Sequence, residues 1–552
     1  MDNQRLIFFI IFSFSILLLW DSWQKEQHSP KTPEQKPSQS VSAEASVPTP
    51  QPTVAIHSDP VVLEAGASAE AQKSGTRIKV ETDVIQAEID TLGGDIRSLS
   101  LLKHREVEDK SKPFVLYEDN AQRTYIAQSG LIGEGLPNHK TLYTSQASAY
   151  KISDNEDHIQ VKLNWNGSSG IAVEKTFTFY KGSYLVDISH EISNNSTNGF
   201  SSHAYYQWQR DNKALPGNSA FMMGTYTGPA VYTGKDKFQK VDFSDIEKGK
   251  EKYPKQSNDG WMAMLQHYFF SAWLPVGDGQ REFYTRKIGE LFTTGVIIPV
   301  ATVEPGAKAV AKMKLYAGPQ EQDHISKLAP GLDLVVDYGM LTVIAAPLFW
   351  IVQMIYKLVQ NWGVAIILLT ILIKLAFYPL SAKSYRSMAA MRVVSPKLQK
   401  LKEQYGSDRQ RLHQAMMELY KTEKINPLGG CLPVIVQMPV FIALYWVLLY
   451  SVEMRQAPFA AWIQDLSAPD PYYVLPIIMG ITMIVQTKLN PTPPDPIQAK
   501  VMMMMPIVFS IFFFFFPAGL VLYWVVNNVI SIAQQWQITR GIEQARAAKG
   551  HG

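Results

Sequence analysis

The stretch GVAIILLTILIKLAFYPL, residues Gly363–Leu380, decides the fold, because eighteen residues this apolar can cross a membrane as one helix. At about 1.5 Å of rise per residue, such a helix covers roughly 27 Å, close to the hydrocarbon thickness of a bilayer. One full charge, Lys374, lies inside it. A charge at that depth costs about 2.5–3.5 kcal/mol on insertion scales, so we expect it to face protein or water. Thr370, Lys374 and Tyr378 follow at every fourth residue, which predicts a polar stripe along one face.

Further apolar runs indicate a polytopic α-helical membrane protein. Four of them follow the first one: Gly430–Val452, Tyr472–Thr487, Val501–Phe516 and Leu520–Gln535. With the run Leu6–Trp20 we predict six transmembrane helices, five of which form a core at residues 363–537. Residues 1–23 are predicted to be a retained anchor, because the run ends in Trp20-Asp21-Ser22-Trp23 without a small-x-small cleavage site. A cleaved signal peptide is the alternative.

The charges between these runs predict the topology. Residues 381–428 hold ten Lys and Arg against four Asp and Glu, which places them in the cytoplasm by the positive-inside rule. Residues 453–471 hold one Arg against three acids and are predicted to lie outside. The basic tail, residues 538–552, returns to the cytoplasm. Counting back along the chain puts the N-terminus inside and the long segment before the core outside.

That long segment, residues 76–330, shows the period-two pattern of β-strands. Ile159, Val161 and Leu163 alternate with polar residues, and the same alternation returns in residues 171–179 and 184–192. Turns such as NGSSG and KGS separate these runs. Many short alternating strands predict a large all-β sandwich outside the cytoplasm.

Two further segments flank the predicted sandwich. Residues 24–75 are rich in Pro, Ser, Gln and Thr and predict a disordered tether. Residues 331–362 are amphipathic, with Pro347, Gln353 and Lys357 interrupting the apolar face. We predict a helix that lies along the membrane surface, the alternative being a transmembrane helix with polar defects.

The cytoplasmic segment 381–428 predicts a helical hairpin. Apolar residues recur at helical spacing up to Gly406, a natural helix stop, and Ser407 with Gln410 predicts a capping box for a second helix. Two amphipathic helices joined by a tight turn favour an antiparallel pair. The outward basic residues are a solvated face or a docking surface for anionic headgroups, ribosomal RNA or an incoming chain. They are Lys397, Lys400, Lys402, Arg409 and Arg411.

Several chemistries are absent from the sequence. No G-x-x-x-x-G-K-[ST] motif occurs, so there is no sign of nucleotide-driven work. The one cysteine, Cys431, excludes an internal disulfide. His190, His203 and His267 in the predicted sandwich lack paired carboxylates or metal-ligand spacing, so we read them as packed or surface residues. We therefore expect no catalytic residues, metal or cofactor, and a protein that is not an enzyme.

Polar side chains are also set inside the other predicted spans. Gln437 lies in one run, Thr482 and Gln486 in the next, and a longer series follows in the last run: Tyr523, Trp524, Asn527, Asn528, Ser531, Gln534 and Gln535. Each amide alone could simply join two helices. Beside Lys374, for which no span offers a carboxylate, they indicate a wet cavity among the helices. The run VMMMMPIVFSIFFFFF offers an adaptable apolar surface, or only lipid-facing packing.

A set of short motifs resembles the Oxa/Alb/YidC family of membrane protein insertases, in its Gram-negative bacterial form. The motifs occur in the family's order: NWG (361–363), YPL (378–380), NPLGGC (426–431), QMP (437–439), RQAPFA (455–460), DPYY (470–473) and FPAGLVLYW (516–524). The resemblance covers anchor, tether, external β domain and five-helix core.

The resemblance implies a hydrophilic groove, open to cytoplasm and lipid, that receives the substrate. The family's intramembrane cation aligns with Lys374, although Arg is usual there. The aligned groove positions are Thr370, Gln437, Trp524 and Asn528. Met438, Phe441 and Phe516 align with the hydrophobic path that the substrate's transmembrane segment follows. The hairpin, with Lys397, Lys400, Arg409 and Arg411, resembles the family's substrate-receiving element, and the β domain is similar in fold to sugar mutarotases without their activity.

The resemblance also implies partners and a location. The expected partners are nascent membrane proteins, the ribosome, the Sec translocon (SecYEG, SecDF) and the phospholipid bilayer, and no small-molecule substrate. The expected location is the bacterial inner membrane, with the β domain in the periplasm. The function implied is insertion, folding and assembly of inner-membrane proteins, alone or with the translocon and without nucleotide hydrolysis.

Two other classes of function remain as alternatives. An ion- or proton-coupled transporter could use Lys374, but it would be expected to carry a partnering carboxylate in a span and internal repeats. A membrane-tethered carbohydrate enzyme could use the β domain. Solute flux without insertion would favour the first, and sugar turnover by the external domain would favour the second.

Overall fold

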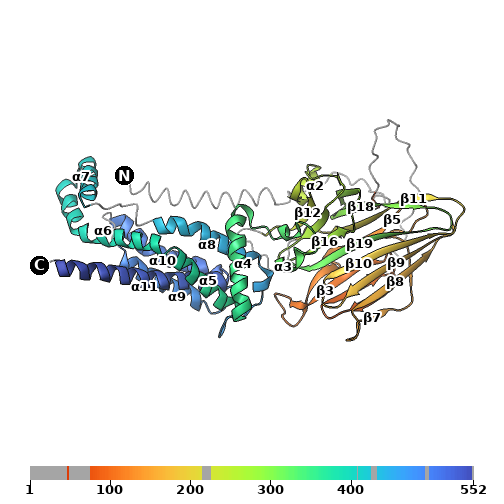
Figure 1. Cartoon of the computed structure of the whole chain (residues 1–552), viewed down its shortest axis with the longest axis horizontal. Coiled ribbons are helices and arrows are strands. Elements are labelled where there is room, and N and C mark those ends of the chain that lie inside the picture. The colour runs from red at the N-terminus through yellow and green to blue at the C-terminus, as the bar shows by residue number, and fades with distance from the viewer. Residues whose placement is uncertain are drawn as a thin grey trace. The chain divides into compact units, whose positions relative to one another are not determined.

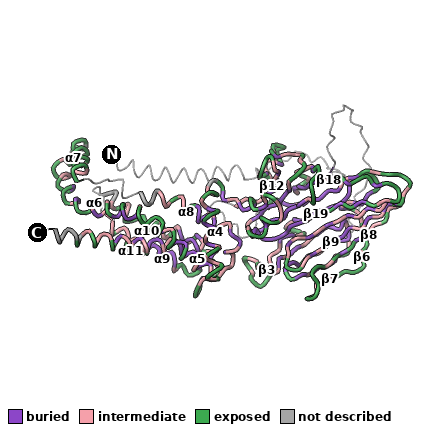
Figure 2. The backbone as a smooth tube through the Cα atoms, in the orientation of Figure 1, coloured by how far each residue is buried: buried purple, intermediate pink, exposed green. Residues whose placement is uncertain are grey.

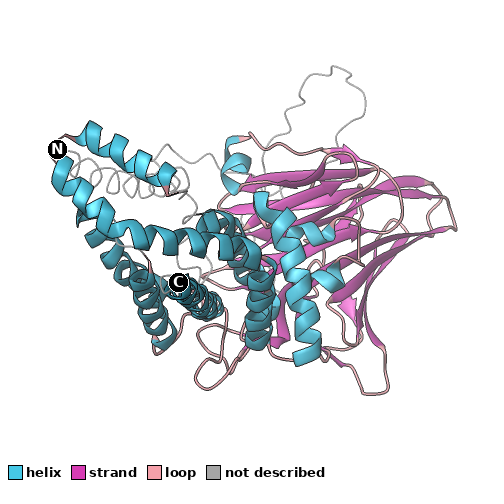
Figure 3. Cartoon of the chain, turned by 60° about the vertical axis from the view of Figure 1, so that its left-hand side comes forward, coloured by secondary structure: helices cyan, strands magenta, loops and turns pink. Residues whose placement is uncertain are grey.

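The computed structural model describes residues 47–48, 75–213, 225–406, 408–423, 432–490 and 496–549. These residues form two compact units that meet in the sequence between Val335 and Val336. Strands make up most of the first unit and helices the second (Figures 1 and 3). The predicted anchor, residues 1–23, and nearly all of the predicted tether lie outside the described residues. Of the tether, Val47 accepts a hydrogen bond from Arg286 and Pro48 is buried, and the disorder of the tether stays a prediction.

The first unit is a sandwich of two large, mostly antiparallel sheets (Figure 1). The ten-stranded sheet has, in spatial order, β14 (Gln256–Ser257), β17 (Arg281–Ile288), β18 (Leu291–Val303), β11 (Phe200–Arg210), β5 (Thr124–Ile132), β4 (Pro113–Asp119), β3 (Asp95–Arg105), β2 (Ile85–Asp90), β1 (Arg77–Glu81) and β7 (Ala149–Lys151). The nine-stranded sheet has β13 (Lys237–Lys240), β12 (Gly228–Thr233), β15 (Trp261–Leu265), β16 (Phe269–Pro275), β19 (Lys308–Pro319), β10 (Leu185–Asn194), β9 (Ile171–Tyr180), β8 (His158–Asn166) and β6 (Thr144–Ser145). Short helices α2 (Phe243–Lys248), α3 (Gln322–Ile325) and η2 (Leu332–Val335) complete the unit.

Alternation along the strands explains why this sequence forms a sandwich. In β10 the residues are buried and half-buried in strict alternation, since successive side chains of a strand point to opposite faces. The buried face meets the other sheet, where Trp208 of β11 stacks on Trp273 of β16 with ring centroids 5.3 Å apart. Figure 2 shows the buried residues running along the inner strands of both sheets. The predicted strands at 159–165, 171–179 and 184–192 correspond to β8, β9 and β10.

The sandwich also buries a row of polar side chains that crosses the ten-stranded sheet. Gln128 donates to Asp95 at 2.8 Å, Gln207 donates to Gln128 at 2.9 Å, and Tyr284 donates to Gln207 at 2.7 Å. Tyr284 reaches Gln207 across β18 because Gly295, which pairs with both, has no side chain between them. A Cβ at Gly295 would lie 2.4 Å from the Tyr206 carbonyl oxygen and 2.7 Å from the Tyr284 hydroxyl.

Two of the three candidate histidines of the sandwich contact aromatic side chains. His190 is fully buried, and its ring lies 3.3 Å from the Tyr206 hydroxyl. His203 is half-buried, and His267 stacks on its neighbour Tyr268. No group of three His, Cys, Asp or Glu within the described ranges could hold a metal ion.

The second unit is helical. Its helices are α4 (Thr342–Val359), α5 (Trp362–Ala376), α6 (Tyr378–Tyr405), α7 (Arg409–Thr422), α8 (Leu432–Tyr450), α9 (Val474–Leu489), α10 (Pro496–Phe512) and α11 (Ala518–Lys549), with short turns η3 (Gly339–Leu341), η5 (Val452–Met454) and η6 (Phe513–Phe515). In the part of the chain that the structure describes, α4 alone is long and apolar enough to cross a membrane, and α5 with α6 passes as a bent pair. The segments Val436–Tyr450, Val474–Leu489 and Ala499–Phe515 are shorter apolar helices. The predicted count of six spans stays a prediction.

The opening helix is not continuous to Leu380. Helix α5 ends at Ala376, and α6 begins at Tyr378 with an axis turned by 67°. Pro379 occupies the first turn of α6, where its missing N–H costs no hydrogen bond, whereas inside a longer helix it would break the ladder. The predicted stripe is therefore wrong at its end. Thr370 and Lys374 are buried, but Tyr378 lies beyond the bend and is 40% exposed.

Helix α4 differs in one respect from the expectation for residues 331–362. Lys357 lies in its last turn and Pro347 inside it, yet its length and apolar content suffice for a span. Its exposed side chains include Val343, Trp350 and Leu358. A position along the membrane surface stays a prediction.

The helical hairpin of α6 and α7 forms as the apolar spacing indicates. Val394 and Leu398 are buried in a small cluster completed by Ala390, Met391, Met416, Leu419 and Tyr420. Helix α6 ends at Tyr405, just before Gly406. The N-cap of α7 is Asp408, whose carboxylate accepts from the backbone N–H groups of Gln410 and Arg411. This corrects the predicted capping box on Ser407, which lies outside the described residues. A carboxylate one residue closer to the helix satisfies the same donors and favours the positive end of the dipole.

Candidate functional site

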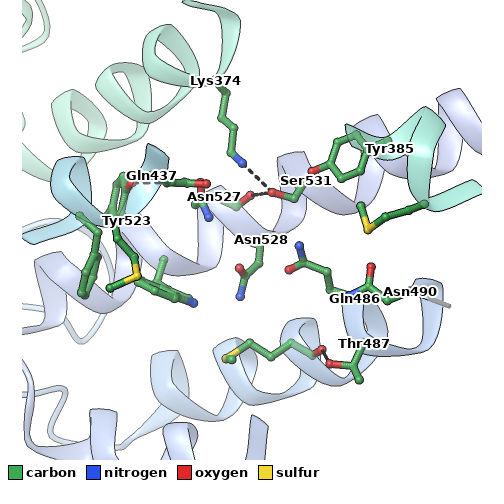
Figure 4. Close-up of a pocket in the computed structure, with 15 residues that line it drawn as sticks. Lys374, Tyr385, Gln437, Gln486, Thr487, Asn490, Tyr523, Asn527, Asn528 and Ser531 are labelled. Carbon is green, nitrogen blue, oxygen red and sulfur yellow. Dashed lines mark hydrogen bonds between the residues drawn. The ribbon is translucent and has the colours of Figure 1, made fainter. Parts of the chain in front are cut away.

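A cavity of about 240 Å³ lies among the helices of the second unit. Its wall comes from α5, α6, α8, α9 and α11, and Figure 4 shows the fifteen side chains that line it. They are Lys374, Tyr385, Met388, Gln437, Met438, Phe441, Met483, Gln486, Thr487, Asn490, Tyr523, Trp524, Asn527, Asn528 and Ser531. Amide, hydroxyl and thioether groups thus share one space with a single cation.

Helix α11 supplies the largest share of this wall. Tyr523, Trp524, Asn527, Asn528 and Ser531 recur at spacings of three and four, so they lie on one face of the helix. The start of α11 is held by the loop after α8, because Ala518 and Gly519 donate their backbone N–H groups to the carbonyls of Ala468 and Leu466. The polar face is therefore fixed toward α5, α8 and α9.

The same loop ties the ends of α5 and α9. Asn361 caps α5 through Val364 and donates from its side chain to the Phe459 carbonyl at 2.9 Å. The Phe459 ring covers Gly363, where a Cβ would lie 2.0 Å from the ring. The buried carboxylate of Asp470 accepts from the Leu475 N–H at the start of α9 and from Trp462. One loop thus anchors three helices of the cavity wall at the same end.

Lys374 is the cation of the cavity. Its side chain is 6% exposed, and its ammonium donates to the hydroxyl of Ser531 at 2.7 Å (Figure 4). No carboxylate approaches it within ion-pair distance in the described ranges. An ammonium carries three donors, and the Ser531 hydroxyl accepts one of them. The charge is therefore held by a neutral partner.

Single polar contacts connect α11 to its other neighbours. Gln437 of α8 donates to the Asn527 side chain, and Asn528 donates to Thr482 of α9 at 3.1 Å. Gln535 donates to Asn490, just beyond α9, at 3.0 Å. Such contacts between apolar helices are worth about 1 kcal/mol each, so they hold the wall without locking it.

The remaining wall is apolar and soft. Met438 is 54% exposed, and Phe441 meets Trp524 edge to face with ring centroids 4.4 Å apart. Outside the cavity, the exposed faces of α9 and α10 carry large apolar side chains: Ile477, Ile481, Val485, Met503, Met504, Ile507, Val508 and Ile511. Flexible methionines among branched side chains suit apolar partners of varied shape.

Six of the eight predicted groove and path residues line this cavity: Lys374, Gln437, Met438, Phe441, Trp524 and Asn528. Thr370 does not reach it, because its buried hydroxyl donates to the Ile366 carbonyl of its own helix at 2.7 Å. Phe516 does not reach it either, because it is buried against Phe512, Phe513 and Tyr445. The roles of the six residues stay predictions.

The sequence did not single out several lining residues as site residues. Asn527 and Ser531 continue the three-to-four spacing of Trp524 and Asn528, so that spacing could have identified them. Tyr385 could not be found in this way, because it enters the cavity only through the bend between α5 and α6. Met388, Met483, Thr487 and Asn490 give no signal beyond helical spacing.

The predicted docking residues of the hairpin differ in their surroundings. Lys397 forms an ion pair with Glu423 at 2.6 Å across the two helices. Arg411 pairs with Asp408 at 3.3 Å, and Lys400 is exposed. The side chain of Arg409 lies outside the described part of the chain.

The chain has a large β-sandwich followed by an apolar helical unit, whose polar-lined cavity holds one cation. This is the architecture that the resemblance to the Oxa/Alb/YidC insertases predicts. Residues 77–351 match the family described as YidC periplasmic domain, and residues 354–545 match the family described as 60Kd inner membrane protein. The chain therefore belongs to the YidC family of membrane protein insertases.

Two relatives carry the same printed name, "Membrane protein insertase YidC". The one from Methylobacillus flagellatus is 56% identical over 551 residues, which cover 100% of this chain and 99% of that protein. The one from Nitrosospira multiformis is 55% identical over 561 residues, covering 99% of this chain and 98% of that protein. A crystal structure of an active YidC insertase, with its first transmembrane domain resolved, covers 84% of this chain and 92% of its own at 19% identity and a TM-score of 0.39.

Proposed function

We propose that this chain inserts proteins into the bacterial inner membrane and helps them fold and assemble. It does so through the cavity around Lys374, which opens to lipid, alone or together with the Sec translocon and without nucleotide hydrolysis. The observation that carries the proposal is a buried cation whose partner is a neutral hydroxyl, in a wall of amides and methionines that includes the exposed Met438. Such a cavity binds polar groups that enter from water and borders apolar surface that can receive a hydrophobic segment.

The proposed mechanism divides the cargo between these two surfaces. A short hydrophilic tail of the cargo enters the cavity, where Lys374 and the amides of Gln437 and Asn528 replace part of its lost hydration. The adjoining hydrophobic segment passes Met438 and Phe441 and then moves into lipid. Transfer of its apolar surface, at about 25 cal/mol per Å², supplies the driving force.

The proposed topology follows the loop charges. Six spans place both termini in the cytoplasm and the β-sandwich in the periplasm, with α4 along the membrane surface. The hairpin of α6 and α7 then lies in the cytoplasm, where its basic residues are proposed to dock the ribosome or the incoming chain: Lys397, Lys400, Arg409 and Arg411. The excess of Lys and Arg in residues 381–428 supports this arrangement.

Substitution of Lys374 tests the proposed function. Lys374→Arg should retain insertion of a single-span cargo into proteoliposomes, because a positive charge with several donors remains. Lys374→Ala should reduce it about tenfold or more, since a hydrogen bond to a charged group is worth about 1.5–3 kcal/mol. Lys374→Glu should reduce it at least as much.

The matched control is Lys383→Ala, which removes an exposed lysine of α6 that does not line the cavity. This variant should insert cargo at the rate of the unmodified protein. Full activity of Lys374→Ala would contradict the proposed function.

A further inference from the structure

Two residues of the predicted tether, Val47 and Pro48, contact the sandwich. The carbonyl oxygen of Val47 accepts a hydrogen bond at 3.4 Å from the guanidinium of Arg286 in β17, 239 residues further along the chain. Pro48 is buried. A segment this rich in polar residues exposes its side chains to water when it is unbound. A buried proline beside a bonded carbonyl therefore indicates a binding contact.

The tyrosine two residues earlier orients Arg286. Tyr284 and Arg286 lie on the same face of β17, and the guanidinium carbon lies 5.2 Å from the centroid of the Tyr284 ring. The Tyr284 hydroxyl in turn donates to Gln207 at 2.7 Å, which makes it the last member of the polar row that begins at Asp95. The row fixes the ring, and the ring supports the guanidinium that binds Val47.

The face that carries this row points away from the second sheet. Gln207 and Trp208 are successive residues of β11, and Trp208 stacks on Trp273 of the other sheet, so Gln207 points to the opposite face. Gln207 is nevertheless buried. One cover on this face is the loop after β5, whose His139 N–H donates to the Tyr205 hydroxyl at 2.9 Å. Segments from elsewhere in the sequence thus cover the outer face of the ten-stranded sheet.

The tether sequence suits a contact of this kind. Residues 47–52 read VPTPQP, with a proline at every second position. A residue before a proline, such as Val47, is restricted to extended or polyproline backbone, which makes no internal hydrogen bonds and leaves its carbonyl available to a donor. Proline-rich segments are recognised in general by surfaces lined with aromatic side chains. The Tyr284 ring and the Arg286 donor provide both features.

We propose that the outer face of the ten-stranded sheet at Tyr284 and Arg286 is a docking surface, and that its occupant is the Val47–Pro48 segment of the chain's own tether. Docking shortens the free link between the predicted anchor and the sandwich from residues 24–74 to residues 24–46. At about 3.1 Å per extended residue, the maximum span of that link falls from roughly 160 Å to roughly 70 Å. The contact therefore limits the distance between the sandwich and the predicted anchor.

Limited proteolysis of the full chain in detergent measures the docking. A glutamate-specific protease cuts after Glu44 only when the residues that follow, up to Val47, can enter its active site, whereas a cut after Glu64 does not involve the docked pair. Cleavage of a segment that opens and closes rapidly tracks the population of its open form. The ratio of the Glu44 rate to the Glu64 rate therefore reports undocking.

Arg286→Met should raise this ratio about fivefold, because Val47 loses a charged donor while the sequence of the tether is unchanged. Arg286→Lys keeps a charged donor and should raise the ratio less. The matched control is Lys287→Met, which removes the neighbouring cation on the opposite face of β17, where it pairs with Glu247 at 2.5 Å. This variant should leave the ratio unaltered.

Pro48→Ser tests the same contact from the tether side and leaves the sandwich sequence intact, so it also serves if Arg286→Met fails to fold. Its ratio, divided by the ratio in a free peptide with the same substitution, should rise above the corresponding value of the unmodified protein. An unchanged ratio in both Arg286→Met and Pro48→Ser would overturn the tether as the occupant of this surface. An equal rise in Lys287→Met and Arg286→Met would overturn the role of Arg286, because β17 as a whole would then be disturbed.

Discussion

A lysine inside an apolar helix is tolerated here because the fold brings it an acceptor. At the transmembrane depth proposed for α5, the insertion cost of such a charge is about 2.5–3.5 kcal/mol, and a hydrogen bond to a charged group returns about 1.5–3 kcal/mol. The two magnitudes nearly offset, so Lys374 needs no carboxylate to stay buried beside Ser531. A weakly compensated cation remains available to a ligand, whereas a full ion pair would not.

The geometry around residue 374 also explains why a lysine can occupy this position. An arginine presents a rigid, planar fork, whereas a lysine is a point charge on a flexible stem. The single acceptor at Ser531 suits a point charge and makes no use of bidentate geometry. We therefore expect the position to accept either cation.

His139 in the β-sandwich makes a pH dependence predictable. Burial is the first cause that lowers the pKa of His139, from 6.5 to about 3. In the unfolded chain His139 is protonated below about pH 6.5, whereas in the folded protein it stays neutral there. Its contribution to the free energy of unfolding therefore falls as the pH drops below 6.5. The slope is about 1.4 kcal/mol per pH unit for one proton. Burial also lowers the pKa of His190 well below 6.5, which adds a slope of the same sign.

Asp95 acts in the opposite direction. Its burial raises the pKa to about 6, so the folded protein keeps a proton that the unfolded chain releases near 3.8, and stability falls as pH rises through that window. Two histidines against one aspartate leave a net loss of stability on acidification from pH 7 to pH 5.

We predict that His139→Gln reduces this pH slope by about one proton, measured by urea unfolding of purified residues 75–335 at pH 7 and pH 5. Tryptophan fluorescence can follow the unfolding, since Trp208 and Trp273 are buried. His158→Gln, which changes an exposed histidine of β8, is the control and should leave the slope unaltered. An unchanged slope in His139→Gln would show that burial does not keep His139 neutral in the folded protein.

At the scale of elements, the period of the hydrophobic pattern and the composition predicted which strands and helices form. They did not predict the angle between consecutive helices. Alternation gave the strands β8, β9 and β10 and the sandwich, because a half-buried strand must alternate whatever its neighbours are. Apolar length gave the positions of α5 and α8 to α11. The bend after Ala376 was missed, because Pro379 is compatible with both a helix start and a kink. The sequence therefore could not predict features that depend on this bend, such as the position of Tyr385 in the cavity wall.

The hairpin offers a test of which contacts hold an element together. Leu398 is buried in its small apolar cluster, whereas Lys397, one residue earlier, forms an exposed ion pair with Glu423. Leu398→Ala should destabilise the hairpin by about 2–3 kcal/mol, because a buried leucine is lost from a cluster that can partly collapse. Lys397→Ala should change it by less than about 1 kcal/mol.

Hydrogen exchange of the α7 backbone amides in the full chain measures both effects. Faster exchange in Leu398→Ala, with little change in Lys397→Ala, is the expected result. If Lys397→Ala opened the hairpin as much as Leu398→Ala, the ion pair and not the apolar cluster would stabilise the element.

At the scale of the whole molecule, the chain consists of two units with separate interiors. The sandwich is held by apolar contacts between two sheets, and the helical unit by apolar helices joined through single polar contacts. Sequence composition predicted this division, because alternating strands and continuous apolar runs cannot share one pattern. It could not predict the cavity, which depends on how five helices are rotated about their axes.

Two glycines, one in each unit, allow the separation to be tested on the full chain. A Cβ at Gly295 of β18 would lie 2.4 Å from the Tyr206 carbonyl oxygen, and a Cβ at Gly363 of α5 would lie 2.0 Å from the Phe459 ring. Alanine at either site should destabilise its own unit by about 1–3 kcal/mol through overpacking, which outweighs the gain in helix propensity at Gly363. Calorimetry of the detergent-solubilised protein should then show two transitions. Gly295→Ala should lower only one of them and Gly363→Ala only the other, each by several degrees. A single transition, or a shift of both by either variant, would mean that the two units unfold as one.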